Sequence, residues 1–172
     1  MKRKKILTSK AIQRQIEKRD KGLGSISLLE KYGLFMAECQ MIEWGLKLLL
    51  IEDKKYIFER IENKPLGWVI RHAEKEGLRV DFLQLLDELL GYRNKMVHEF
   101  LYDFAILNQI LKGKKYTKPY RILSNALHIA DNAYIVLNFL RENKYQFWIK
   151  KKKIRSVAKV NIGIEKFFNY QA

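Results

Sequence analysis

The chain has 172 residues, of which 48% are hydrophobic and 31% are charged, and its formal net charge at pH 7 is +15. This length and composition indicate one globular domain and exclude a disordered or fibrous chain. Only nine Gly and two Pro are present, too few for a turn-rich β-sandwich or barrel. The single cysteine, Cys39, excludes an intrachain disulfide and a Cys-based zinc cluster, so we expect a reducing, cytoplasmic location.

Apolar residues at steps of three and four predict helices along most of the chain. Ser27 and Glu30 form a capping-box signature at the start of the longest of the early helices. Pro65 and Pro119 each favour the first turn of a further helix, and Gly77 favours an end. The expected helices are 4–20, 27–52, 54–62, 66–75, 81–101, a segment 102–111 that continues or reverses the one before it, and 119–144.

These elements predict an all-α fold, an up-and-down bundle of four to five helices. We expect a single domain over 1–172, with a basic N-terminal segment at 1–22, a helical core at 23–145 and a basic C-terminal extension at 146–172. No apolar run reaches the roughly 18 residues of a membrane span, so no membrane partner is expected.

The positive charge is concentrated at the two ends of the chain. Residues 1–22 and residues 141–172 each carry nine Lys or Arg and two Asp or Glu, whereas the part between them is almost neutral. Such ends favour a polyanionic partner, above all nucleic acid, although solvated tails or an anionic membrane surface would share the pattern. The expected RNA-binding residues are Lys150, Lys151, Lys152, Lys153 and Arg155.

Three aromatic residues, Tyr145, Phe147 and Trp148, precede this basic run. They could stack on the bases of a single strand. The interpretation we favour from the sequence is that Phe147 and Trp148 pack the last helix onto the bundle.

The helix expected from Asp81 carries the candidate site. Steps of four residues lead from Leu86 through Leu90 to Asn94 and His98, and Arg93 lies one heptad after Leu86. This spacing predicts that Arg93, Asn94 and His98 all face the otherwise apolar side of the helix. Polar groups placed there must be paired, line a cavity or face a second subunit.

Two explanations of this cluster remain open. An internal polar network would suffice, with Arg93 held by Glu43 or Asp87 and His98 bonded to a backbone carbonyl. Alternatively, the cluster is catalytic, because histidine transfers protons near neutral pH and the guanidinium of arginine matches the oxygens of a phosphate. The histidines His72 and His128 lack ligand partners at zinc spacing, and we expect no metal and no cofactor.

The segment Arg93-Asn94-Lys95-Met96-Val97-His98 resembles the Arg-x4-His motif of HEPN domains, which includes a polar residue after the Arg. The stretch Ala37–Leu49, with its acidic residue and nearby Lys, is similar to the early helix of those domains. Leu66–Ile70 is similar to the short segment between the two. The resemblance covers roughly residues 27–140.

The resemblance implies a helical bundle that dimerises with two copies of the motif in one cleft. It implies a metal-independent endoribonuclease of a toxin–antitoxin, phage-defence or RNA-processing system. Arg93 and His98 would be the catalytic pair, Asn94 the supporting polar residue, and Glu43 a further supporting residue. One subset of the family has a Tyr two residues after the His that a partner nucleotidyltransferase modifies. Phe100 stands there in this chain, which argues against that form of antitoxin.

We therefore expect cleavage of single-stranded RNA through attack by the ribose 2′-OH, in a homodimer with a possible antitoxin partner. Two other classes remain open. One is a non-catalytic HEPN-like module that binds RNA, nucleotide or a protein partner. The other is a helical interaction or immunity protein whose basic ends contact DNA.

Overall fold

The computed structural model describes residues 7–23, 26–100, 118–142 and 147–148. The regular elements in these ranges are all helical: α1 (Ser9–Leu23), α2 (Leu28–Lys54), α3 (Phe58–Ile61), α4 (Leu66–Lys75), α5 (Val80–Lys95), the π-helix η1 (Met96–Phe100) and α7 (Lys118–Glu142). The all-α prediction is confirmed. The expected segment at 102–111 and the residues from 149 on, which include most of the basic C-terminal extension, lie outside the described residues.

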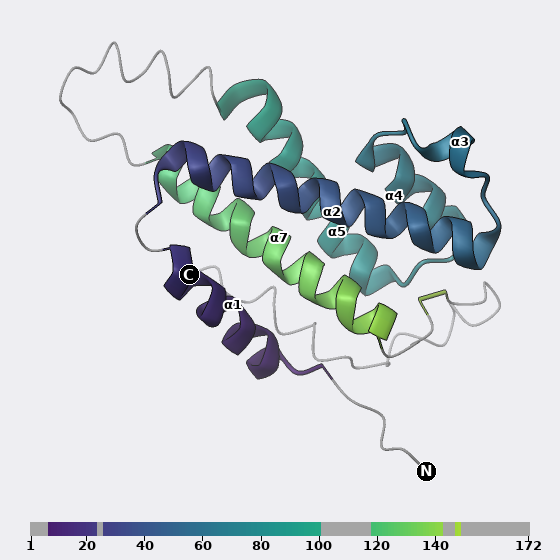
Figure 1. The fold of residues 1–172 in the computed structure, drawn as a ribbon, viewed down its shortest axis with the longest axis horizontal. Coiled ribbons are helices and arrows are strands. Elements are labelled where there is room, and N and C mark those ends of the chain that lie inside the picture. Colours follow the sequence, from purple (N-terminus) through teal and green to yellow (C-terminus); the bar gives the residue numbers. More distant parts are fainter. Residues whose placement is uncertain (1–6, 24–25, 101–117, 143–146, 149–172) are drawn as a thin grey trace.

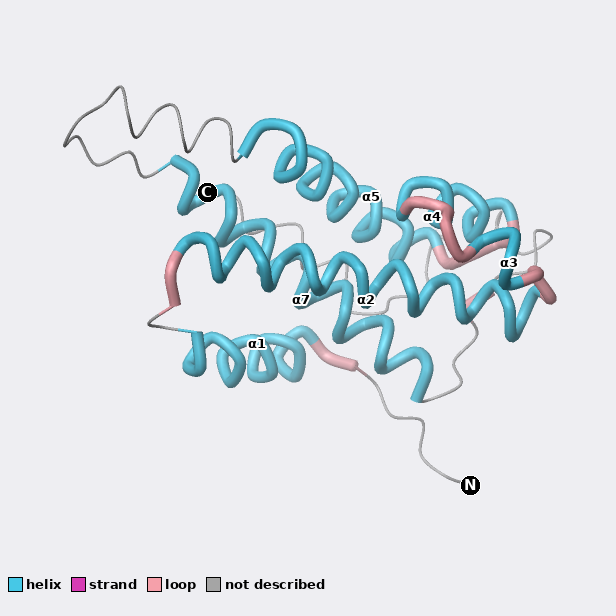
Figure 2. The backbone as a smooth tube through the Cα atoms, turned by 45° about the horizontal axis from the view of Figure 1, so that its top comes forward, coloured by secondary structure: helices cyan, strands magenta, loops and turns pink. Residues whose placement is uncertain are grey.

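Four long helices form an up-and-down bundle. Figure 1 shows α2 and α7 side by side and running in the same direction, with α5 running back behind them and α1 lying along α7. The shorter helices α3 and α4 cover one end of α2, as Figure 2 also shows. The core between these helices is built mainly from leucine, isoleucine, phenylalanine and alanine side chains.

Local sequence signals fix both ends of α2. The side chain of Ser27 accepts a hydrogen bond from the Glu30 amide, and the Glu30 carboxylate accepts one from the Ser27 amide. This is the expected capping box, and the bonds to the Ser27 backbone and side chain lower the pKa of Glu30. At the other end, Lys55 adopts a left-handed conformation with φ of 61°. Its backbone stops the helix, so the expected helix at 54–62 is reduced to Phe58–Ile61.

A close approach places α7 against α2. A Cβ atom on Gly45 would lie 2.5 Å from Cδ2 of Leu137, inside van der Waals contact. Gly45 is buried, so a side chain here would have to displace the end of the Leu137 side chain, and glycine leaves that space to Leu137. α2 is thereby held along α7, the helix against which the motif-bearing α5 also packs.

Lys47 joins α3 to α2 from inside the protein. Its side chain is 2% exposed, and its ammonium lies 2.6 Å from the Glu43 carboxylate and 2.7 Å from the backbone carbonyl oxygen of Glu62. It also lies over the ring of Trp44, which stacks on Phe58 of α3. A buried ammonium requires this pairing, because an isolated charge in the interior costs several kcal/mol.

Replacement of Lys47 by Ala should therefore destabilise the protein by about 2–4 kcal/mol, since it removes a buried partner and leaves the Glu62 carbonyl unsatisfied. Urea denaturation followed by circular dichroism measures the change in the free energy of unfolding. Lys75→Ala is the matched control, because that lysine is exposed on α4 and its replacement should change stability by less than about 0.5 kcal/mol. Equal stability of the two variants would contradict this role of Lys47.

Candidate active site

The three motif residues lie on two consecutive helical turns. Arg93 and Asn94 are in the last turn of α5, and His98 is at the centre of η1. η1 follows α5 without a break, so the motif lies on one continuous helical rod, which the structure describes as far as Phe100.

The prediction that all three side chains face the core is wrong. Arg93 is half-buried, whereas Asn94 and His98 are exposed. The reason is the helical period: a step of four residues turns about 40° beyond a full turn, so two such steps from Leu86 carry Asn94 about 80° away from the core, and His98 follows on a π-helical turn of a different period. Arg93 stays closer because a heptad step deviates by only about 20°. The buried side chains at this end of the rod are Leu89, Met96 and Phe100.

Two of the three motif residues are in direct contact. Nη1 of Arg93 donates a hydrogen bond to Oδ1 of Asn94 over 3.3 Å. The amide oxygen thus orients the guanidinium, which is the role expected of a supporting polar residue. The ring of His98 has no hydrogen bond to any described residue, and the expected bond to a backbone carbonyl is not formed within the described part of the chain.

The inner side of Arg93 faces α2. Burial raises the pKa of Cys39 to about 12; the positive charge of Arg93 works against this rise, and the negative charges of Glu38 and Glu43 add to it. The charges of Arg93, Glu38 and Glu43 therefore all act on the buried thiol of Cys39 in α2. Cys39 itself is a buried core thiol, which remains protonated at neutral pH.

Glu43 does not hold Arg93. Its carboxylate forms the 2.6 Å ion pair with Lys47, so the expected pairing of Glu43 with Arg93 is replaced by an internal link of α2 to α3. Asp87, the other expected partner, is exposed on α5 and forms no ion pair with Arg93 in the described structure. The expected internal polar network is thus absent around Arg93 as far as the described residues extend.

The position two residues after His98 is closed to solvent. Phe100 is 4% exposed and its ring stacks on Tyr32 of α2, with 5.6 Å between centroids and 5° between planes. The Phe100 side chain has no hydroxyl group that a partner enzyme could modify, and it is buried.

The basic run Lys150, Lys151, Lys152, Lys153 and Arg155 lies outside the described residues, as does Tyr145. The two aromatic residues just before the run are described. Phe147 is 4% exposed, and its carbonyl accepts a hydrogen bond from the Arg79 amide over 3.0 Å. The prediction that this pair packs on the bundle is confirmed, but neither residue is helical, and Trp148 forms an isolated antiparallel bridge with Leu78.

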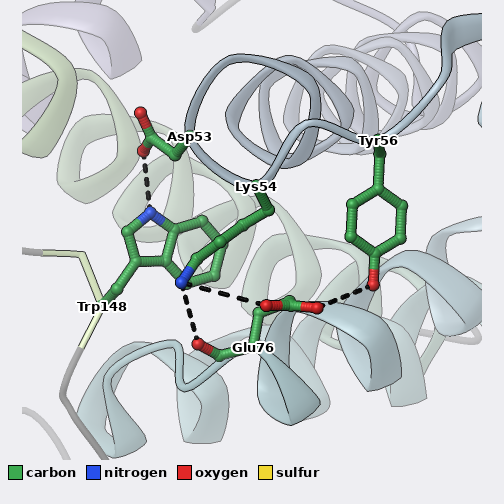
Figure 3. Close-up of polar contacts among 5 residues, drawn as sticks. All are labelled: Asp53, Lys54, Tyr56, Glu76 and Trp148. Carbon is green, nitrogen blue, oxygen red and sulfur yellow. Dashed lines mark hydrogen bonds and ion pairs between the residues drawn. The ribbon is translucent and has the colours of Figure 1, made fainter.

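Figure 3 shows how Trp148 is held. Its indole Nε1 donates a 2.7 Å hydrogen bond to Asp53, and the ammonium of Lys54 lies 4.4 Å from the centre of its ring. Lys54 in turn contacts Glu76 through the backbone carbonyl and the carboxylate. Sequence reasoning missed this cluster, because its members come from three separate segments and no local spacing links them.

The same cluster contains Tyr56, whose hydroxyl donates a hydrogen bond to Glu76 over 3.1 Å. Burial and this bond to the carboxylate raise the pKa of Tyr56. The cluster is at the end of α5 opposite the motif, about 21 Å from Arg93 when measured as 14 residues of helix from Arg79. Trp148, the last described residue, therefore lies far from Arg93.

In the described ranges, no three His, Cys, Asp or Glu side chains come together in a way that would hold a metal ion. The helices described here also include none that is long and apolar enough to cross a membrane.

No protein-family model, curated protein or solved structure matches this chain. The chemistry open to the site therefore follows from its own residues. A guanidinium bonded to Asn94 and an accessible imidazole five residues further along the same rod suit a phosphodiester: the first binds the phosphate oxygens and the second exchanges protons with the reacting oxygens.

Proposed function

We propose that the protein is a metal-independent endoribonuclease that cleaves single-stranded RNA. The observation that carries this proposal is that Asn94 and His98 are exposed and Arg93 is half-buried on consecutive turns of one rod, with the guanidinium bonded to Asn94. A polynucleotide is too bulky to enter the interior of a small bundle, so a site for it must be accessible from solvent. The Arg-x4-His spacing shared with HEPN domains agrees with the proposal.

The reaction follows from the two side chains. His98 accepts the proton of a ribose 2′-OH as the 2′-oxygen forms a bond to the adjacent phosphorus. Arg93 stabilises the negative charge of the phosphorane, the bond to the 5′-oxygen breaks, and that oxygen takes up a proton. The products are a 2′,3′-cyclic phosphate and a 5′-OH. General base catalysis contributes about 10²–10⁴-fold, and charge stabilisation adds a few kcal/mol.

A second copy of the chain supports this chemistry. One imidazole cannot be base and acid at the same instant, and the other two histidines are on α4 and α7. A homodimer with the motif at its interface would supply a second His98. α2 exposes an apolar stripe, whose side chains follow each other at steps of three and four, and helices pair through stripes of this kind. The stripe consists of Leu34, Ala37, Met41 and Trp44.

The setting that we propose is a toxin–antitoxin or phage-defence system of the cytoplasm, with an antitoxin protein as a further partner; it rests on the HEPN resemblance alone. A non-catalytic module that binds RNA or nucleotide is the alternative. It is favoured by one observation, that His98 forms no bond to Arg93 or Asn94 in the described structure, since Arg93 with Asn94 would suffice to grip a phosphate.

Arg93→Ala and His98→Ala should each lower cleavage of single-stranded RNA by at least about 10²-fold, while DNA, which lacks the 2′-OH, stays intact. Gel analysis with end-group mapping measures the rate and the cyclic phosphate product, with and without EDTA. His128→Ala is the matched control, since His128 is also exposed on a helix. Full activity in both site variants, or strict dependence on added Mg²⁺, would contradict the proposal.

Met41→Glu should convert a dimer to a monomer, because a carboxylate would then be desolvated in the centre of the apolar stripe. Size-exclusion chromatography with light scattering measures the change. Val80→Glu places the same charge on another exposed apolar residue, at the start of α5, and should leave the dimer intact. A monomeric wild-type protein, or a dimeric Met41→Glu variant, would exclude this interface.

Replacing the five basic residues at 150–155 by Gln should weaken RNA binding and flatten its salt dependence. Each phosphate of a single strand that is no longer neutralised lowers the slope of log K against log salt by about 0.7, so the slope should fall by up to about 3.5. Fluorescence anisotropy over a salt series measures both quantities. An unchanged affinity and slope would show that the extension does not contact RNA.

A further inference from the structure

The turn that carries His98 has an unusual backbone. Residues 96–100 form a π-helix, in which each amide bonds to the carbonyl five residues before it instead of four. Such turns are rare and are concentrated at functional sites. A turn of this kind persists only where the surrounding structure holds it in place.

Two buried anchors bracket the exposed part of this turn. Met96 is 0% and Phe100 4% exposed, whereas the three residues between them, His98 among them, face solvent. The turn is therefore fastened at its first and last residues. The position of the imidazole depends on how firmly the last of these is held.

Tyr32 of α2 holds that last residue. Its ring is half-buried and almost parallel to the ring of Phe100, at a centroid distance within the range of favourable offset stacking. Tyr32 follows the capping box at Ser27 and Glu30 by two residues, so its own backbone is fixed in the first turns of α2. No described residue bonds to its hydroxyl, which leaves the ring face as its contribution.

We propose that Tyr32 is a positioning residue for His98, acting through Phe100 and the π-helical turn. This inference rests on the proposed function for its effect on cleavage, but the clamp itself is a property of the fold. The stack holds Phe100 in place, and with it the π-helical turn from which the imidazole of His98 projects. The Tyr32 hydroxyl is not needed for this stack. Phe at position 32 should therefore preserve the position of His98, whereas an aliphatic side chain should not.

Amide hydrogen exchange and NMR of the His98 ring, measured on the full chain, test the clamp without reference to activity. In Tyr32→Leu the exchange of amides 97–100 should rise about 3- to 10-fold and the His98 resonances should shift, whereas Tyr32→Phe should match wild type. Tyr56→Leu is the control for removal of a half-buried tyrosine at the other end of α2; it should leave these amides unchanged.

Cleavage kinetics complete the test. Tyr32→Leu should lower kcat about tenfold and change KM less than about twofold, because substrate binding does not depend on the position of the imidazole. Unchanged exchange at 97–100, or raised exchange with wild-type kcat, would overturn the proposal. If the wild-type chain does not cleave RNA, the proposed function fails, and exchange with the His98 resonances alone decides whether the clamp exists.

Discussion

The packing of α2 against its neighbours is the constraint on which the other features depend. Its buried side meets α7 at the close approach around Gly45, and its ends contact η1 through Tyr32 and the α4–α5 turn through Lys54. Because a single rigid helix touches both ends of the antiparallel α5, the spacing between the motif and the Trp148 cluster is fixed. Small shifts along this interface would move the candidate site directly, since protein interiors are close-packed.

The ion pair of Lys47 and Glu43, with the bond from Lys47 to the Glu62 carbonyl, stabilises the packing of α3 on α2. The same ion pair explains why Glu43 is not available to Arg93. Arg93 instead bonds to Asn94 and exerts an electrostatic influence on the buried thiol of Cys39. N–H donors of the Arg93 guanidinium thus stay available to an external ligand. A complete internal hydrogen-bond network would have used them.

The candidate site and the aromatic pair Phe147 and Trp148 lie at opposite ends of α5. The 24 residues after Trp148, which include the basic extension, lie outside the described part. The aromatic pair Phe147 and Trp148 acts as the attachment point, and its partners Asp53 and Arg79 belong to two different helix ends. The π-helical turn at the other end of α5 is held in a similar way. There the stack of Tyr32 on Phe100 joins chain segments that are almost 70 residues apart in sequence.

The sequence by itself determined the helical class, the capping box at Ser27 and Glu30 and most helix limits, because caps and apolar periods act over a few residues. It also singled out Arg93, Asn94 and His98 as chemistry-bearing neighbours. Only the tertiary structure decided where they point: four-residue steps drift off the buried face of a helix, and the packing of α5 against α7 and α4 leaves Asn94 and His98 in solvent. Likewise, the partner of Glu43, the stack of Tyr32 on Phe100 and the anchoring of Trp148 arise from contacts between distant segments, which no local pattern encodes.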